Sequence, residues 1–325
     1  MRLLLATLVA FLLAVPTASA ALVYVKTPAS GAPTIFAAGN DGSDPRRLVD
    51  GTQPQISGDG ATVAFLRASG SRTELALIPT AGGPVRALVT SSSIESVTFS
   101  PDAKLVAAEV GGRRLMVFET DTGRMGTLAT GFIKGLSFAP DSTRMVFGRG
   151  VDATARGTAD VYKVSVRGGP ARRLTRDGRS LLPIWGPQRI AFVKQKGAER
   201  TSMIPAYDVW GMDVGGRQER RITVTKVPSG VSGLLPIEWS ADGRRLIAQY
   251  VGANVRVGFT INPNSGGTRS LRRKVAFDLA SDGSAVLTQS GGIDPAARHN
   301  VYAAPYAGGE SELLVRNASF PDWSR

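Results

Sequence analysis

Residues 235–250 read LPIEWSADGRRLIAQY, and this stretch decides the fold of the 325-residue chain. An apolar run ends at Trp239, the pair Asp242-Gly243 follows, and a second apolar run begins at Leu246. Asp-Gly between two such runs is typical of a β-hairpin, because a type I′ turn needs positive φ at its central residues. The stretch is therefore predicted to form two antiparallel strands joined by a tight turn.

Related copies of this stretch recur along the chain. The copies of the first strand and its turn lie at residues 56–60, 99–102, 138–141, 185–187, 239–243, 279–283 and 321–324. Their spacing is roughly 40 to 55 residues, which is the period of a propeller blade. The repeat therefore predicts a ring of similar units.

The sequence between the copies repeats as well. A third apolar run follows the second, then a tight turn that is often Gly-Gly, and then a short fourth run that begins with basic residues. Such pairs of basic residues are Arg46-Arg47, Arg172-Arg173 and Arg220-Arg221. Each unit should therefore hold four short strands, with the arginines on the outer strand, where charge deters pairing between edges.

The two chain ends complete one unit. Residues 22–26 look like a second strand, and residues 321–324 supply a first strand with almost nothing after it. The sequence thus predicts an all-β fold, a seven-bladed β-propeller whose terminal blade is closed by N- and C-terminal strands. Six blades is the alternative, because the copies near Trp185 and Leu279 are degenerate.

The first 20 residues differ from the rest. A charged start, an apolar run from Leu3 to Val15 and an Ala-Ser-Ala site ending at Ala20 are typical of a secretory signal peptide. We expect a signal peptide at 1–20 and a propeller domain at 21–325, with no membrane span after cleavage. The expected location is the periplasm, the cell wall or the medium.

The composition limits the partners. The chain carries 39 Lys+Arg against 26 Asp+Glu, a formal net charge of +13, and no cysteine. This balance favours an envelope protein or an anionic wall polymer as the partner. Nucleic acid is not expected, because the basic residues do not gather into one block with aromatic residues. We expect a monomer.

The repeat resembles that of the TolB-type, WD-repeat-like propeller family. The resemblance rests on the Phe-Ser-Pro-Asp motif at 99–102, the Trp-Ser-Ala-Asp-Gly motif at 239–243 and the Arg-Arg-Leu-Thr motif at 172–175. It implies a propeller over the whole chain after residue 20. TolB has an α/β domain before its propeller and binds a peptidoglycan-associated lipoprotein; the resemblance does not extend to that domain. Related propellers gate prolyl-oligopeptidase-type enzymes or form the body of oligogalacturonate lyases.

The candidate binding residues lie in four long connections, at 148–159, 194–207, 224–235 and 290–299. In a four-stranded blade these connections open on one face, which we call the loop face; the tight turns share the opposite face, the turn face. Long loops on a rigid scaffold commonly carry binding residues. The predicted contact residues are Arg149, Arg156, Lys194, Lys196, Arg200, Lys226, Arg298 and His299.

No catalytic constellation is visible in the sequence. His299 is the single histidine, and a lone histidine in a loop is expected to be exposed. There is no Gly-x-Ser-x-Gly elbow and no His-Glu-x-x-His helix, and we expect no metal and no cofactor. Trp185, Trp239 and Trp323 occupy equivalent first-strand positions and should anchor the core. The sequence favours a non-enzymatic scaffold; the alternative is a glycosidase or lyase with carboxylates on the loop face.

Overall fold

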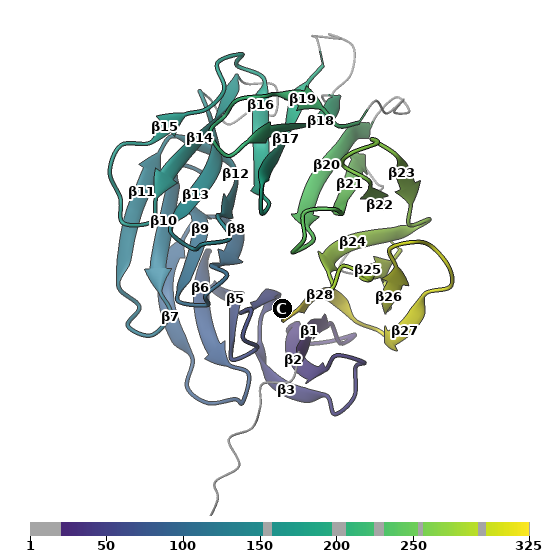
Figure 1. Cartoon of the computed structure of the whole chain (residues 1–325). Coiled ribbons are helices and arrows are strands. Elements are labelled where there is room, and N and C mark those ends of the chain that lie inside the picture. Colours follow the sequence, from purple (N-terminus) through teal and green to yellow (C-terminus); the bar gives the residue numbers. More distant parts are fainter. Residues whose placement is uncertain are drawn as a thin grey trace, which may run out of the picture.

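The computed structural model describes residues 21–151, 158–196, 206–223, 231–252, 256–291 and 297–324. All regular secondary structure in these ranges is β-strand. The strands form five four-stranded sheets and one eight-stranded sheet, which stand around a common axis (Figure 1). In the part of the chain so described, no helix has the length and hydropathy to cross a bilayer. The predicted all-β fold is confirmed.

Each four-stranded unit runs from the axis outward in chain order, except at the chain ends. The first strands are β4 (Thr52–Ile56), β8 (Ile94–Phe99), β12 (Phe132–Phe138), β16 (Ser180–Trp185), β20 (Val231–Trp239), β24 (Lys274–Leu279) and β28 (Ser319–Trp323). The second strands are β1 (Ala21–Lys26), β5 (Thr62–Ser69), β9 (Leu105–Val110), β13 (Arg144–Gly150), β17 (Arg189–Gln195), β21 (Leu246–Gly252) and β25 (Ala285–Ser290).

The outer half of each unit consists of a third and a fourth strand. The third strands are β2 (Thr34–Gly39), β6 (Arg72–Pro79), β10 (Arg114–Glu119), β14 (Ala159–Ser165), β18 (Tyr207–Asp213), β22 (Arg256–Ile261) and β26 (Val301–Pro305). The fourth strands are β3 (Arg46–Asp50), β7 (Arg86–Ser91), β11 (Met125–Thr130), β15 (Arg172–Arg173), β19 (Arg220–Arg221), β23 (Thr268–Ser270) and β27 (Glu312–Val315).

The eight-stranded sheet contains two such units. Strands β16 to β19 and strands β20 to β23 each pair as four antiparallel strands. A single parallel bridge between Tyr207 and Gly233 joins them. The two units therefore have separate antiparallel ladders.

The chain ends meet in one sheet with the order β28-β1-β2-β3. Leu22 lies opposite Trp323, and Val23 lies opposite Asp322. In Figure 1 the last strand, β28, lies beside β1 and close to the axis. The predicted pairing of the N- and C-terminal strands is confirmed.

The turn at residues 240–243 is tight, but its predicted type is wrong. The amide of Gly243 donates to the carbonyl of Ser240 at 2.9 Å, which closes a four-residue β-turn. Gly243 has φ 68°, whereas Asp242 does not have positive φ, as a type I′ turn would require. Asp242 instead accepts hydrogen bonds from the Ser240 hydroxyl at 2.6 Å and the Arg244 amide at 2.9 Å, which stabilise the turn from within.

The tryptophans at the ends of first strands anchor the core, as expected. Trp185, Trp239 and Trp323 are each 8–9% exposed and belong to separate apolar clusters. Each cluster joins one unit to the next, as Trp239 does with Ala191 and Val209 of the preceding unit. The hydrophobic core is therefore divided among the joints between units.

Gly186 should be intolerant of a side chain, because its backbone lies against the indole of Trp239. A Cβ at this position would come within 2.7 Å of Trp239 Cγ. We expect Gly186→Ala to lower the free energy of unfolding by about 1–3 kcal/mol, the usual cost of overpacking. Gly126→Ala is the control, since a Cβ there would meet only Val117 at 3.8 Å. Chemical denaturation measures both; an equal effect of the two changes would contradict the prediction.

Candidate functional site

The structure describes five of the eight predicted contact residues, and these five differ in exposure and in partners. Arg149 is half-buried in β13, with its guanidinium 4.1 Å from the centre of the Tyr162 ring. Arg298 is exposed and precedes β26. Arg156, Arg200 and Lys226 lie outside the described residues. The connection expected at 224–235 is also shorter than predicted, because β20 begins at Val231.

Lys194 and Lys196 are engaged with acidic residues of their own chain. Lys194 Nζ lies 2.7 Å from Asp177 Oδ2 and also pairs with Glu219. Burial lowers the pKa of Lys194, but the hydrogen bonds with both carboxylates outweigh this effect and raise the pKa overall. Lys196 Nζ lies 2.9 Å from Oδ1 of the buried Asp208. Reversing either lysine would therefore disturb the fold as well as any ligand. Asp177 and Glu219 would lose their ion pairs with Lys194, and Asp208 would keep only its ion pair with Arg221.

His299 is not the exposed loop residue that the sequence suggested. Its side chain is only 3% exposed, and its Nδ1 donates a hydrogen bond to the carbonyl of Ser290 at 2.7 Å. The backbone carbonyl of His299 accepts from the amide of Ala318 at 2.9 Å. The histidine thus ties the connection before β26 to the last segment of the chain, which explains its burial.

Exposed arginines missed by the sequence argument occupy the loop face. Among the described residues, they lie in the short turns between second and third strands and in the connections from fourth to first strands. They are Arg72, Arg113, Arg114, Arg176, Arg179, Arg272, Arg273 and Arg316. The exposed acidic residues described there are Asp50, Glu95 and Asp177, and two of them pair with Arg47 and Lys194. The pairs at 113–114 and 272–273 were visible in the sequence, at the strand boundaries.

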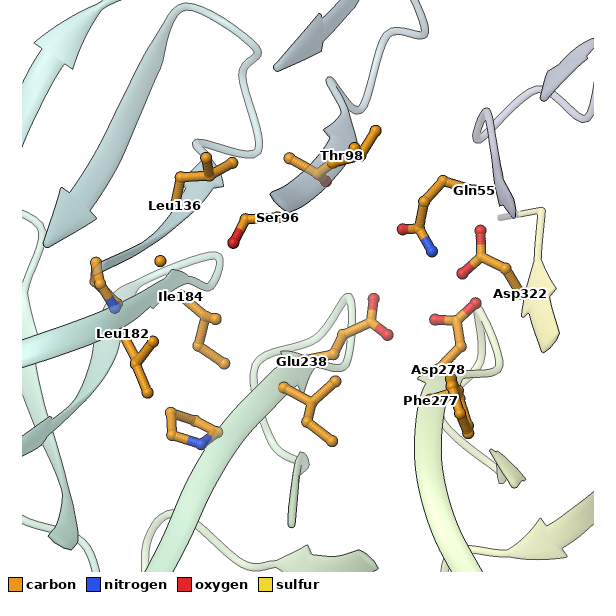
Figure 2. A pocket seen from close by; sticks show the side chains of 15 residues that line it. Gln55, Ser96, Thr98, Leu136, Leu182, Ile184, Glu238, Phe277, Asp278 and Asp322 are labelled. Atoms are coloured by element: carbon orange, nitrogen blue, oxygen red, sulfur yellow. The ribbon is translucent and has the colours of Figure 1, made fainter. Parts of the chain in front are cut away.

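The first strands enclose a central channel. A cavity of about 260 Å³ on the axis is lined by residues from β4, β8, β12, β16, β20, β24 and β28. Figure 2 shows three carboxylates that face this space, those of Glu238, Asp278 and Asp322, beside the amide of Gln55. No functional group was predicted here from the sequence, although an acidic residue directly precedes the anchor in each of the last three copies.

These carboxylates hold neighbouring units together. Glu238 Oε2 accepts the backbone N–H of Leu279 at 3.0 Å, and Asp278 Oδ2 accepts that of Trp323 at 2.9 Å. Asp322 Oδ2 accepts the N–H of Ile56 at 2.7 Å. In each pair the side chain before one anchor binds the amide of the anchor in the next unit, so we call these contacts inner latches. Ser137 forms the same latch to Trp185 at 3.0 Å.

Two of the latch carboxylates interact strongly. Asp278 is 2% exposed, and burial raises its pKa to about 6. Burial also raises the pKa of Asp322 well above its usual value, and the negative charge of Asp278 raises it further. Figure 2 shows the two carboxyl groups pointing toward one another. Ionising two neighbouring carboxyl groups places two negative charges side by side, which costs free energy, so the two groups titrate as one pair. We call Asp278 and Asp322 the carboxyl pair.

A second set of contacts joins the units at their outer strands. An arginine of the fourth strand donates to a backbone carbonyl after the third strand of the next unit, and we call this contact an arginine clip. The clips are Arg46 to Thr80, Arg86 to Thr120, Arg172 to Gly215, Arg220 to Pro263 and Arg269 to Tyr306. Five of the chain's arginines therefore have a structural use at the joints between units.

Comparison with known proteins supports the fold. No family model and no curated protein matches the chain. TolB from Acinetobacter baumannii shares 15% identity, with 94% of this chain and 82% of that chain covered and a TM-score of 0.58. An oligogalacturonate lyase in complex with manganese shares 16%, with 92% and 86% covered and a TM-score of 0.62.

A third solved structure differs in its closure. The β-propeller domain of the trilobed protease from Pyrococcus furiosus shares 14% identity, with 91% of this chain and 94% of that chain covered and a TM-score of 0.64. It is described as having an open velcro topology, whereas here β28 pairs with β1. The fold and channel thus define a β-propeller. Within that class the chain is TolB-like, which describes its fold and not its activity.

Proposed function

We propose that this protein is an exported, seven-bladed β-propeller that binds an envelope protein or an anionic wall polymer through its loop face, without catalysis. Residues 1–20 act as its signal peptide, and it works as a monomer in the periplasm, at the cell wall or outside the cell. The blade number is supported by the lining of the channel, to which seven first strands contribute. The pairing of β1 with β28 supports the shared terminal blade.

The observation that carries the binding proposal is the charge of the loop face. Most described exposed charges there are arginines, and they include the pairs Arg113-Arg114 and Arg272-Arg273. Arginine presents a planar, permanently charged fork that suits carboxylates and phosphates. Arg149 and Arg298 belong to this surface, whereas Lys194 and Lys196 contribute less, because their charges are paired within the chain.

Reversing charge on the loop face should weaken binding to isolated envelope material about tenfold or more, because like charges across an interface are strongly unfavourable. The test variant is Arg272→Glu/Arg273→Glu, and both positions are exposed. The control is Arg217→Glu/Arg244→Glu, with the same change in net charge on the turn face. Co-sedimentation with the envelope fraction measures both. Equal retention of the two variants would refute the loop face as the contact surface.

The alternative, a carbohydrate-active enzyme, is favoured by one observation: three carboxylates line the channel. Each of them, however, accepts a backbone N–H of the neighbouring unit, so each already has a structural use. Turnover of acidic oligosaccharides that is abolished by Glu238→Gln in a folded variant would favour the enzyme over the scaffold.

A further inference from the structure

The arginine clips occupy one register position in the outer strands. Their third-strand partners are Ala37 for Arg46, Leu77 for Arg86, Lys163 for Arg172, Gly211 for Arg220 and Thr260 for Arg269. Each receiving carbonyl follows the third strand of the next unit. A joint without an arginine at this position therefore lacks a contact that five other described joints have.

The joint between the β8–β11 unit and the β12–β15 unit is such a place. Thr80 and Thr120 are equivalent, because their amides donate to Ala61 and Lys104, at the start of the second strands. Leu77 and Val117 lie three residues earlier, and they pair with Arg86 and Gly126 respectively. Gly126 therefore stands where the other joints have arginine. The receiving residue, by the same equivalence, is Val166, whose amide donates to Thr143.

A cleft opens at this joint. It has a volume of about 930 Å³ and is lined from both units, by residues that include Thr120, Asp121, Ser165 and Val166. The joint between the β24–β27 unit and the β28-β1-β2-β3 unit also lacks the arginine, because Glu312 stands opposite Ala303 at this position. There the gap is closed by backbone packing, because a Cβ on Gly42 would come within 2.5 Å of the Leu314 carbonyl oxygen.

The lining of the cleft suits a guanidinium group. Four carboxylates contribute to it, and Glu119 among them already pairs with Arg124; the others are those of Asp102, Asp121 and Asp141. The basic residues of the lining are Lys104, Arg144 and Arg167. Arg144 is directed to Asp141, at 3.2 Å, and lies 5.9 Å from the Trp185 ring. Beside Gly126, Met125 is 59% exposed and offers an apolar contact on the outer edge.

We propose that this cleft binds an arginine side chain of another protein, which takes the place that the chain's own arginines take at five joints. The guanidinium lies between the Val166 segment and the carboxylates around Asp121, and the arginine belongs to an extended segment that runs beside β11. Arginine fits better than lysine, because its planar fork can donate to a carbonyl and a carboxylate at once. The cleft lies toward the turn face, so the proposal does not depend on binding through the loop face.

The test titrates N-acetyl-argininamide into the ¹⁵N-labelled propeller domain and follows the amides of Asp121 and Val166. The citrulline analogue has nearly the same shape without the charge. Its affinity for the cleft should be lower by about tenfold or more. Gly126→Arg should fill the site from within the chain, abolish binding of the probe and raise Tm. The position accepts a side chain, because Gly126 does not have positive φ and a Cβ meets only Val117.

Gly126→Ala is the matched control and should bind as the unaltered protein does. If Gly126→Arg does not fold, Asp121→Asn replaces it and should weaken binding of the arginine probe several-fold. Absence of binding, equal binding of arginine and citrulline, or full binding by a folded Gly126→Arg variant would each overturn the proposal.

Discussion

Trp323→Ala is expected to lower the free energy of unfolding by about 3–5 kcal/mol, the usual cost of removing a buried tryptophan. Trp323 is 8% exposed, packs in one cluster with Leu22 and Tyr24, and donates its backbone N–H to Asp278. The cluster holds the last strand against the first one, so the substitution should also loosen the sheet that joins the chain ends. Chemical denaturation measures the first effect, and hydrogen exchange of the β1 amides measures the second.

The matched control is Trp185→Ala. Trp185 is 9% exposed and ends a first strand in the same way, but it lies in a unit that is continuous in sequence. Both changes should cost similar free energy, whereas only Trp323→Ala should speed exchange in β1 before the whole domain unfolds. Equal exchange of β1 in the two variants would show that the terminal sheet does not open by itself.

The fold could be predicted because its signals are local. Three of the repeated turns use the same pair of side chains, with the hydroxyls of Ser57, Ser100 and Ser240 each donating to an aspartate two residues later at 2.6 Å. Such chemistry repeats with the sequence, so the copies were visible without coordinates. The error in turn type has the same origin, because the dipeptide Asp-Gly does not distinguish a type I′ turn from a type I turn followed by glycine.

The candidate site could not be predicted to the same extent, because its contacts join distant residues. Lys194 is 25 residues from Glu219 in sequence, and nothing local indicates that the two pair. The inner latches are formed by Ser137, Glu238, Asp278 and Asp322, at one position that varies in residue type. The acidic residue recurs in the last three copies but is serine at Ser137, and the amide that each side chain binds becomes visible only once the sheets stand side by side.

The carboxyl pair should make the protein less stable as the pH rises through about 6. Folding raises the pKa values of Asp278 and Asp322 above those of the unfolded chain. A group of this kind contributes its full stability below the unfolded pKa, near 4, and loses it as the pH passes the folded pKa. For Asp278, a rise from 3.8 to about 6 corresponds to a loss on the order of 3 kcal/mol.

Asp322→Asn should remove the part of this loss that comes from Asp322, whose pKa is raised by burial and by the charge of Asp278. The amide oxygen of asparagine can still accept the N–H of Ile56, and its NH₂ group can donate to the Asp278 carboxylate that Asp322 faces. The variant should match the unaltered protein near pH 4 and exceed it in stability at pH 8. Urea unfolding at both pH values measures the difference.

The comparison must be made between variants, because other groups titrate in the same range. Burial and, to a smaller extent, the charge of Glu95 raise the pKa of Glu109 to about 7, although Lys134 opposes the shift. Glu109 therefore also lowers stability at high pH, and it does so equally in the unaltered protein and in the Asp322→Asn variant. Glu238, which lies beside the carboxyl pair, is likewise present in both. Subtracting the two pH profiles leaves the contribution of the pair. An Asp322→Asn variant that is no more stable than the unaltered protein at pH 8 would mean that ionisation of Asp322 does not lower the stability of the fold.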